Sequence, residues 1–263
     1  MKKILFLLLM GCTLAACSQN APDPKVVAHR GYWKTDGSAQ NSISSLRNAG
    51  EIGAYGSEFD VNLTADGELV VNHDFTYHDL VIAETDLATL RDPSLTLANG
   101  ECIPTLDEYF EASLQYPEMK LIFELKSKGD LEYEARALPA IVEAINRHGV
   151  ADRIEFISFS LSACVDFARL MPDNVVEYLG GEITPANLHS MGITGIDYEY
   201  PVIILHPEWV EEAHKLGMVV NTWTVNKAED MRQLLELGVD QITTNEPLLA
   251  AKIIEEFKAV KKK

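Results

Sequence analysis

The stretch of sequence that decides the fold is residues 207–244, PEWVEEAHKLGMVVNTWTVNKAEDMRQLLELGVDQITT. Apolar residues recur three and four positions apart over Pro207 to Leu216 and over Lys227 to Leu237, which predicts two amphipathic helices. A glycine that can end a helix follows each of them. After each glycine comes a run rich in β-branched residues, which predicts a strand. These runs are Met218 to Val225 and Gln241 to Thr244. This alternation of helix and strand indicates a parallel sheet.

The same alternation extends back through most of the chain. Further helices are predicted at Ser42 to Gly53, capped by Asn41 or Ser42, and at Leu131 to His148. About eight strand–helix units of this kind predict a closed (β/α)8 barrel of the TIM type. Nine runs are predicted to be strands: 26–29, 57–63, 69–73, 120–126, 154–160, 175–179, 193–198, 218–225 and 241–244.

One strand is therefore surplus to an eight-stranded barrel. The segment 61–71 contains it, because the turn from Thr64 to Gly67 is too short to hold a crossover helix. Residues 75–104 also interrupt the alternation and contain no clean strand. We expect these residues to form an excursion over one mouth of the barrel.

The first residues have the layout of a targeting segment. Lys2 and Lys3 precede the apolar run Ile4 to Met10, which is too short to span a membrane as a helix. Small residues then lead to a cysteine in Leu14-Ala15-Ala16-Cys17. This ending resembles the bacterial lipoprotein signal, in which the cysteine is acylated and becomes the mature N-terminus. An ordinary signal peptide cleaved nearby is the alternative.

The expected organisation has three parts. Residues 1–16 would be the signal peptide, and residues 17–24, with the acylated Cys17, would be a polar tether. Residues 25–263 would form the barrel as one domain. The protein would then be a membrane partner through its lipid anchor, on the periplasmic or outer face of a bacterial cell envelope.

Composition and charge exclude some classes of function. The 263 residues carry a net charge of −18 at pH 7, and 47% of them are hydrophobic, which is enough for a full core. Such an acidic chain repels nucleic acid, so we expect no nucleic-acid partner. A small anionic substrate would have to be held locally, by a few cations or a bound metal. Cys102 and Cys164 could pair in an oxidising compartment, but we expect two buried thiols.

Charged side chains occur where several of the predicted strands end. Residues i and i+2 lie on one face of a strand, so Glu58 and Asp60 project together, as do Glu124 and Lys126. In a parallel barrel the carboxyl ends of the strands meet at one face, where active sites form. We therefore expect two histidines, three carboxylates, an arginine and a lysine to converge: His29, Arg30, Glu58, Asp60, His73, Glu124 and Lys126.

Taken in order, these motifs resemble the glycerophosphodiester phosphodiesterase family, whose members have a phospholipase C-like phosphodiesterase barrel. The resemblance extends from Val26 to Pro247. It rests on motifs at the strand ends and in the loops: Ala28-His29-Arg30-Gly31, Gln40-Asn41-Ser42, Glu58-Phe59-Asp60-Val61, Leu63-Thr64-x-Asp66-Gly67, Val70-Val71-Asn72-His73-Asp74, Ile103-Pro104-Thr105-Leu106, Phe123-Glu124-Leu125-Lys126, Ser158-Phe159, Trp223-Thr224-Val225-Asn226 and Gly238-Val239-Asp240 before Thr243.

The resemblance implies metal-dependent hydrolysis of a small-molecule glycerophosphodiester to glycerol 3-phosphate and an alcohol. Glu58, Asp60 and Glu124 would bind one divalent cation, and an all-oxygen ligand set suits Mg²⁺ or Ca²⁺. His29 and His73 would be the acid–base pair, one activating the nucleophile and the other protonating the leaving alkoxide. Either water attacks the phosphorus directly, or a substrate hydroxyl attacks first and forms a cyclic phosphate.

Other positions would bind the substrate. Arg30 and Lys126 would supply positive donors to the phosphate, which the acidic surface lacks. Trp223 would form a wall for the glycerol or the head group, or would be a core aromatic residue. The acid pair Asp197 and Glu199 is not expected to bind the metal. No role is expected for the histidines that are predicted to be solvated on loops or helix surfaces: His78, His148, His189, His206 and His214.

Three departures from the family pattern leave the alcohol specificity open. Gln40 stands where the family usually has glutamate, and we expect this amide to orient its neighbours without binding the metal. The usual Arg-Thr-Thr stretch after His73-Asp74 is absent, and Phe75 to His78 follows instead. The closing Thr-Asp element is Thr244-Asn245 here.

Three other functions compete with this interpretation. A non-catalytic lipoprotein could bind phosphodiesters or sugars, but it would not need a paired acid and base. A phosphodiesterase of the same architecture could act on a phosphoinositide or a sphingolipid, which the missing Arg-Thr-Thr stretch favours. A sugar isomerase barrel would carry a glycine-rich phosphate loop late in the chain, and Gly238 alone does not form one.

Overall fold

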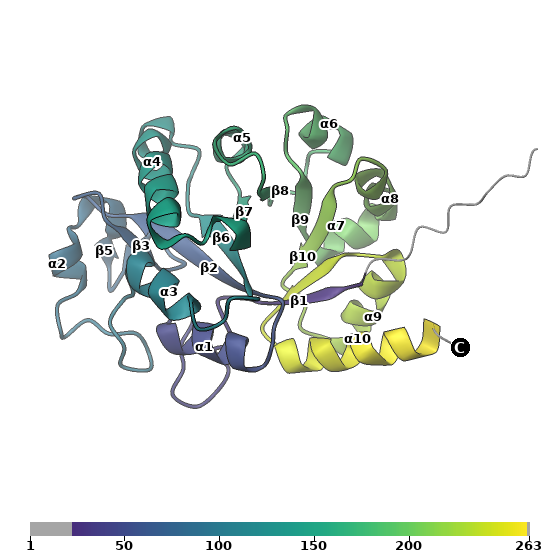
Figure 1. Ribbon diagram of the computed structural model, residues 1–263, viewed down its shortest axis with the longest axis horizontal. Coiled ribbons are helices and arrows are strands. Elements are labelled where there is room, and N and C mark those ends of the chain that lie inside the picture. The colour runs from purple at the N-terminus through teal and green to yellow at the C-terminus, as the bar shows by residue number, and fades with distance from the viewer. Residues whose placement is uncertain (1–22, 262–263) are drawn as a thin grey trace, which may run out of the picture.

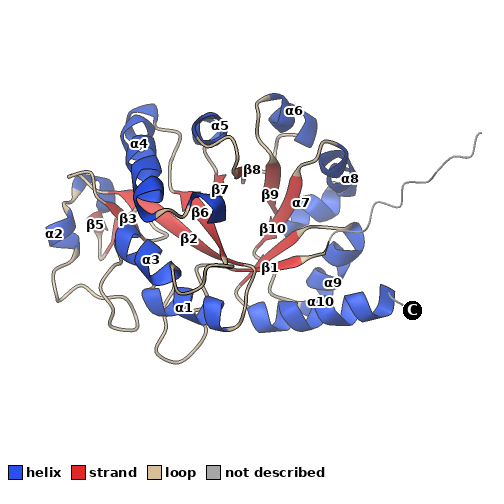
Figure 2. Cartoon of the chain, viewed as in Figure 1, coloured by secondary structure: helices blue, strands red, loops and turns tan. Residues whose placement is uncertain are grey.

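The structure is a computed structural model that describes residues 23–261, so the predicted signal peptide and Cys17 lie outside the described residues. Eight parallel strands form the centre of the molecule, and helices cover them from outside (Figures 1 and 2). In sequence order the strands are β1 (Lys25–Ala28), β2 (Gly56–Leu63), β6 (Lys120–Leu125), β7 (Ile154–Ser158), β8 (Val175–Tyr178), β9 (Gly195–Glu199), β10 (Val219–Trp223) and β11 (Gln241–Thr244).

The strands form a nearly closed ring. Neighbours are paired in the order β10-β9-β8-β7-β6-β2-β1-β11. The two ends of this row are joined by the Asp240 N–H, which donates to the Val220 carbonyl at 2.8 Å, and by the Val225 N–H, which donates to the Thr243 carbonyl at 3.0 Å. The prediction of a (β/α)8 barrel is confirmed.

The surplus strand is β3 (Leu69–Val71). It pairs antiparallel with the end of β2, with Val61 opposite Val71 and Leu63 opposite Leu69. Because a short turn joins the two strands, β3 lies outside the parallel ring, as predicted for this segment.

Residues 75–104 leave the ring and pack as a small lobe beside β3 (Figure 1). The lobe contains β4 (Thr76–Tyr77), β5 (Leu80–Val81), the 3₁₀ turn η1 (Ile82–Glu84) and the short helix α2 (Leu87–Leu90). Its own apolar core is small, which explains why no long periodic pattern marks it in the sequence. That core consists of Val70, Tyr77, Ile82, Leu90 and Ile103.

The helices follow the strands around the ring. Ser42 caps the first helix by accepting from the Ser45 N–H, and Gly53, with a φ of +67°, lies just beyond its end, as the sequence predicts. The sequence predicts four of the helices, those that begin near residues 43, 131, 207 and 228, and it does not mark the others. The remaining helical elements are α1 (Ile43–Glu51), α3 (Leu106–Ser113), α4 (Leu131–His148), η2 (Ala151–Arg153), α5 (Leu161–Leu170), α6 (Pro185–Ser190), α7 (Tyr200–Leu205), α8 (Pro207–Lys215), α9 (Ala228–Leu237) and α10 (Pro247–Lys261).

Aromatic side chains between the strands and the helices fix which face of each strand points inward. Phe59 of β2 and Phe123 of β6 meet edge to face with ring centroids 5.3 Å apart, and both belong to the core shared with the helices. Because successive side chains on a strand alternate between its faces, Glu58, Asp60 and Glu124 point to the opposite side, into the barrel.

Two further expectations concern cysteines and membrane spans. Cys102 and Cys164 are both free thiols. Cys164 is buried as expected, but Cys102 is exposed because it lies on the surface of the 75–104 lobe. Within residues 23–261, no helix is both long enough and apolar enough to cross a membrane.

Candidate active site

The loop that follows β1 places a backbone donor against the first carboxylate. Arg30 has a φ of +57°, and this left-handed backbone directs its N–H to Glu58 Oε2 at 2.7 Å. Gly31 has a φ of +74°, and a Cβ atom built there would clash with Ser45 Oγ on α1. Only glycine fits this position, because both the backbone conformation and the close approach of α1 exclude a side chain.

Three carboxylates converge inside the barrel. Glu58 and Asp60 come from β2 and Glu124 from β6, where Asp60 and Glu124 are direct register partners. One oxygen from each lies within 4.8 Å of the others, and all three side chains are buried. Asp60 Oδ1 is buried and accepts no hydrogen bond from the described residues. The cluster therefore fits a hard divalent cation, which is bound by carboxylate oxygens at about 2.0–2.6 Å.

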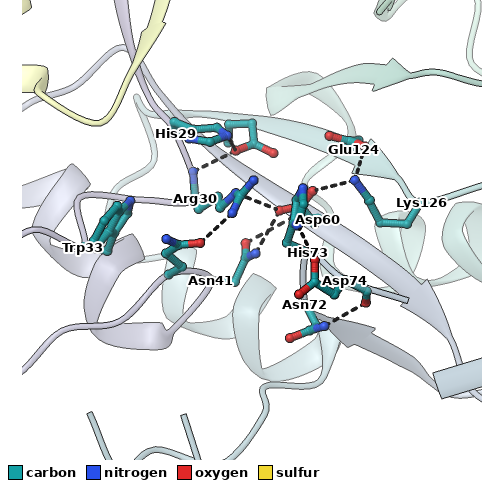
Figure 3. A network of polar contacts seen from close by, with 12 residues as sticks. His29, Arg30, Trp33, Asn41, Asp60, Asn72, His73, Asp74, Glu124 and Lys126 are labelled. Atoms are coloured by element: carbon teal, nitrogen blue, oxygen red, sulfur yellow. Dashed lines mark hydrogen bonds and ion pairs between the residues drawn. The ribbon is translucent and has the colours of Figure 1, made fainter. Parts of the chain in front are cut away.

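Two cationic side chains adjoin the cluster (Figure 3). Lys126 Nζ lies 2.7 Å from Glu124 Oε1 and 3.4 Å from Asp60 Oδ1. Arg30 Nε lies 3.7 Å from Asp60 Oδ2. When all three carboxylates are ionised, they outnumber the two positive charges, and a bound cation would neutralise this excess.

The pKa values of the carboxylates follow from this arrangement. Burial, followed by repulsion from Asp60, raises the pKa of Glu124 to about 8. Burial, with Asp60 and Glu124 nearby, also raises the pKa of Glu58 well above its ordinary value. For Asp60 burial acts in the same direction, but Lys126, His73 and Arg30 outweigh it and lower the pKa. Asp60 is thus the carboxylate that stays ionised most readily.

Two amides support these groups. Asn41, with a φ of +59°, donates from Nδ2 to Asp60 Oδ2 at 2.8 Å. Gln40 Oε1 accepts from Arg30 Nη1 at 2.6 Å, so Gln40 contacts the arginine and lies outside the carboxylate cluster.

Each histidine is held through Nδ1. His29 Nδ1 lies 2.8 Å from Asn245 Oδ1, and its Nε2 lies 4.0 Å from Glu58 Oε2. Burial, followed by the charge of Arg30, lowers the pKa of His29 to about 4. His73 Nδ1 lies 2.7 Å from Asp74 Oδ1 near the surface.

Two cavities meet at this site. The inner pocket, about 170 Å³, is lined by both histidines, two of the carboxylates and an aromatic wall. In that wall Phe159 meets Trp223 edge to face, with ring centroids 5.7 Å apart, and Trp223 Nε1 donates to the Asp197 carbonyl at 2.9 Å. The outer cavity, about 800 Å³, is lined by Trp33, Gln40 and loop residues that include Leu97 of the 75–104 lobe. Arg30 and His73 line both cavities.

The predicted site residues that lie within residues 23–261 come together in the structure, and Trp223 lines the inner pocket. From the sequence, Asn41 and Asp197 are not expected at the site, and Asn245 stands out only as a departure from the family pattern. The sequence pairs Asp197 with Glu199 at i and i+2, but the structure gives the two side chains different surroundings. Asp197 is buried and lines the inner pocket, whereas Glu199 is exposed at the start of α7. The alternation of strand faces would have placed Asp197 inside the barrel.

The expectation that the remaining histidines are solvated was wrong for two of them. His148 Nε2 lies 2.9 Å from Asp107 Oδ1, and His214 Nε2 lies 2.9 Å from Asp240 Oδ2. Both are partly buried and pack against carboxylates away from the inner pocket. They act as contacts between elements of the barrel.

Comparison with known proteins identifies the family. Residues 29–249 match the model of the Glycerophosphoryl diester phosphodiesterase family. A glycerophosphodiester phosphodiesterase from Caldanaerobacter subterraneus subsp. tengcongensis is 30% identical over 235 residues, which cover 84% of this chain and 94% of the relative.

Solved structures agree in fold and sequence. A glycerophosphodiester phosphodiesterase from Parabacteroides distasonis superposes with a TM-score of 0.87 and 46% identity, covering 90% of this chain and 99% of that chain. A phosphodiesterase from Oleispira antarctica, in complex with the product sn-glycerol-3-phosphate, superposes with a TM-score of 0.76 and 28% identity, covering 88% of this chain and 97% of that chain. The chain therefore belongs to the glycerophosphoryl diester phosphodiesterase family and is a phosphoric diester hydrolase.

Proposed function

We propose that the protein hydrolyses glycerophosphodiesters to glycerol 3-phosphate and an alcohol, with a divalent cation and two histidines. The observation that carries this proposal is the meeting of His29, His73 and the buried carboxylates at one small pocket. The Oleispira antarctica relative, with sn-glycerol-3-phosphate bound, supports the product.

Glu58, Asp60 and Glu124 would hold the cation, Mg²⁺ or Ca²⁺. When bound, such a cation polarises a phosphoryl oxygen and offsets the charge that develops on it. Arg30 and Lys126 flank the same cluster and would bind the remaining phosphoryl oxygens. These groups supply the local positive charge that a chain of net charge −18 otherwise lacks.

The two histidines differ in a way that suits opposite roles. His29 is partly buried and its pKa is lowered to about 4, so the ring is neutral near pH 7 and its free Nε2 can accept a proton from the nucleophile. His73 borders the open cavity, and the contact of its Nδ1 with the Asp74 carboxylate orients the ring so that Nε2 can serve the leaving alkoxide as proton donor. The nucleophile at His29 is water or a substrate hydroxyl.

The two cavities would receive the two sides of the phosphodiester. A glycerol moiety fits the smaller inner pocket of about 170 Å³, against Trp223 and Phe159. The leaving alcohol would extend into the outer cavity of about 800 Å³, past Trp33 and Gln40. An open cavity of this size places few steric limits on the alcohol.

The test is an assay of products across several head groups. Glycerophosphocholine, glycerophosphoethanolamine and glycerophosphoinositol are each incubated with the enzyme and Mg²⁺ or Ca²⁺. We expect glycerol 3-phosphate and the free alcohol in equal amounts, and the same rates from a control in which exposed Glu199 is changed to Gln. Release of a phosphorylated head group, or turnover only of sphingolipid or phosphoinositide substrates, would contradict the proposal.

We also propose that Cys17 is acylated and holds the enzyme on the outer side of a bacterial membrane. The support is the Leu14-Ala15-Ala16-Cys17 sequence after a basic and apolar start. Cys17→Ser should release a soluble form or block maturation, as read by membrane fractionation and mass spectrometry. A mature protein with an unmodified N-terminus at another residue would refute the anchor.

A further inference from the structure

Asn245, at the end of β11, lies between two aromatic rings of the β1 loop. Its Oδ1 atom is 2.8 Å from His29 Nδ1 and 3.2 Å from Trp33 Nε1. Its backbone N–H donates to Asn226 Oδ1 at 2.9 Å, which fixes the residue from the other side. The β1–β11 pairing, in which Ala28 is opposite Thr244, brings His29 and Asn245 together.

This geometry determines which nitrogen of His29 carries the proton. An indole N–H can only donate, so the Asn245 atom that faces Trp33 must be the carbonyl oxygen and not the amide nitrogen. The same oxygen faces His29 Nδ1, and an oxygen acceptor requires a donor there. In neutral His29 the proton therefore resides on Nδ1, and Nε2 keeps its lone pair on the side of Glu58 and the inner pocket.

We propose that Asn245 is a positioning residue for the hydrolytic reaction: together with Trp33, it locks His29 in the tautomer whose Nε2 accepts a proton from the nucleophile. This inference rests on the proposed function of His29. Trp33 also lines the outer cavity, which would receive the leaving alcohol. A residue of the outer cavity thus helps to orient His29, which lines the inner pocket proposed for the glycerol moiety.

The tautomer can be measured without any turnover. Histidine labelled with ¹⁵N distinguishes a protonated from an unprotonated ring nitrogen at a pH where the ring is neutral, and His29→Ala identifies the His29 signals. We expect wild-type His29 to be protonated at Nδ1. Asn245→Leu should shift the ring toward Nε2–H or a mixture, whereas Asn245→Asp, which keeps an acceptor oxygen, should retain Nδ1–H. A wild-type ring protonated at Nε2, or an unchanged tautomer in Asn245→Leu, would overturn the proposal.

Kinetics provide the second readout. Asn245→Leu should lower kcat about 10- to 100-fold, the usual cost of losing such a support, with KM changed by less than about threefold. Asn245→Asp should recover most of kcat. Trp33→Phe keeps the ring but removes the N–H, and it should lower kcat by less than Asn245→Leu does. In an Asn245→Leu background it should have no further effect on kcat, because the oxygen it orients is gone.

Several outcomes separate this proposal from the proposed function. Equal, additive effects of the two substitutions on kcat would contradict a shared support, as would a loss confined to KM. If Asn245→Leu does not fold, Trp33→Phe and Asn245→Asp still test the tautomer and whether the loss is in kcat and not in KM. If the wild-type enzyme cleaves no glycerophosphodiester, the proposed function fails, whereas the ¹⁵N measurement still decides whether Asn245 and Trp33 fix His29.

Discussion

Arg30 contributes to the site through its backbone as well as its side chain. Its left-handed φ of +57° costs a residue with a Cβ atom about 1–2 kcal/mol. The same conformation supplies the 2.7 Å hydrogen bond to Glu58 and leaves the guanidinium beside Asp60 and Gln40. Such local strain persists where the surroundings over-determine it, which is common in active sites. Arg30 thus connects the carboxylate cluster to the outer cavity.

Substitutions of Glu58 and Gln40 test which residues bind the cation. Glu58→Gln removes a charge from the cluster and should abolish most activity and raise the metal concentration needed for half-maximal turnover. Gln40→Glu would pair with Arg30 at the existing contact and should tighten the metal requirement by about a decade or less. Metal titrations of turnover compare the two variants. A mild Glu58→Gln together with an inactive Gln40→Glu would reverse the assignment.

Substitutions of His29 and His73 test whether these histidines act as the acid–base pair. Each histidine-to-alanine change should lower kcat by about two to four decades while leaving the thermal unfolding temperature close to that of the wild type. Arg30→Ala and Lys126→Ala should instead raise KM most strongly, because these side chains bind phosphate. Exposed His78 is the control, and His78→Ala should leave kcat unchanged. Near-normal turnover by either active-site variant on a substrate with a poor leaving group would exclude that histidine.

At the scale of elements, the loop between β1 and α1 carries much of the site. Gly31 lets this loop approach α1 so closely that no side chain fits between them. Its N–H donates to the carbonyls of Ala28 and Glu58 at 3.1 Å each, which ties the loop to both strands. Packing against α1 therefore fixes the position of Arg30.

Gly31→Ala should both destabilise the protein and impair the site. The left-handed backbone alone costs about 1–2 kcal/mol, and the contact with Ser45 should add to this. Gly37→Ala is the matched control, since Gly37 has a φ of +73° but no heavy atom within 4 Å of the added Cβ. Thermal unfolding and kcat/KM are measured for both. Equal losses in the two variants would show that the Ser45 contact is unimportant.

The strand–helix units and the charged site residues could be predicted because their signals are local. Alternating apolar runs mark β10, α9 and β11, and the i, i+2 rule pairs Glu58 with Asp60. Other features depend on distant contacts that a single sequence does not reveal. Asn245 meets His29 only because β11 closes the ring beside β1, and α7 is a six-residue helix with no amphipathic repeat to mark it.

At the scale of the whole molecule, the barrel interior holds acidic groups besides the metal cluster. Glu155 accepts from the Tyr55 hydroxyl at 2.6 Å and from Gln241 Nε2 at 2.9 Å. Both carboxyl oxygens of Glu177 are fully buried and lack hydrogen-bond partners among the described residues. Burial, followed by repulsion from Asp197 and Glu155, raises the pKa of Glu177 well above its ordinary value. Glu177 therefore keeps its proton to a higher pH in the folded protein than in the unfolded chain.

Glu177 should make stability fall as the pH rises. Because the pKa of Glu177 is higher in the folded protein than in the unfolded chain, its contribution to the free energy of unfolding is fully present at low pH. This contribution decreases above about pH 4.5, by at most about 1.4 kcal/mol per pH unit. Glu177→Gln mimics the protonated side chain and removes this loss. The gain in free energy of unfolding over the wild type should grow with pH in denaturant titrations. Exposed Glu236→Gln is the control, and a gain independent of pH would contradict the expectation.

The measurement that tests the central claim most directly is turnover of glycerophosphocholine after exhaustive chelation and verified removal of divalent metal. Activity should disappear and should return when Mg²⁺ or Ca²⁺ is added, because Glu58, Asp60 and Glu124 form a buried cluster suited to one divalent cation. Glu58→Gln should not recover at the same metal concentration. Full turnover by the metal-free wild-type enzyme would contradict the account.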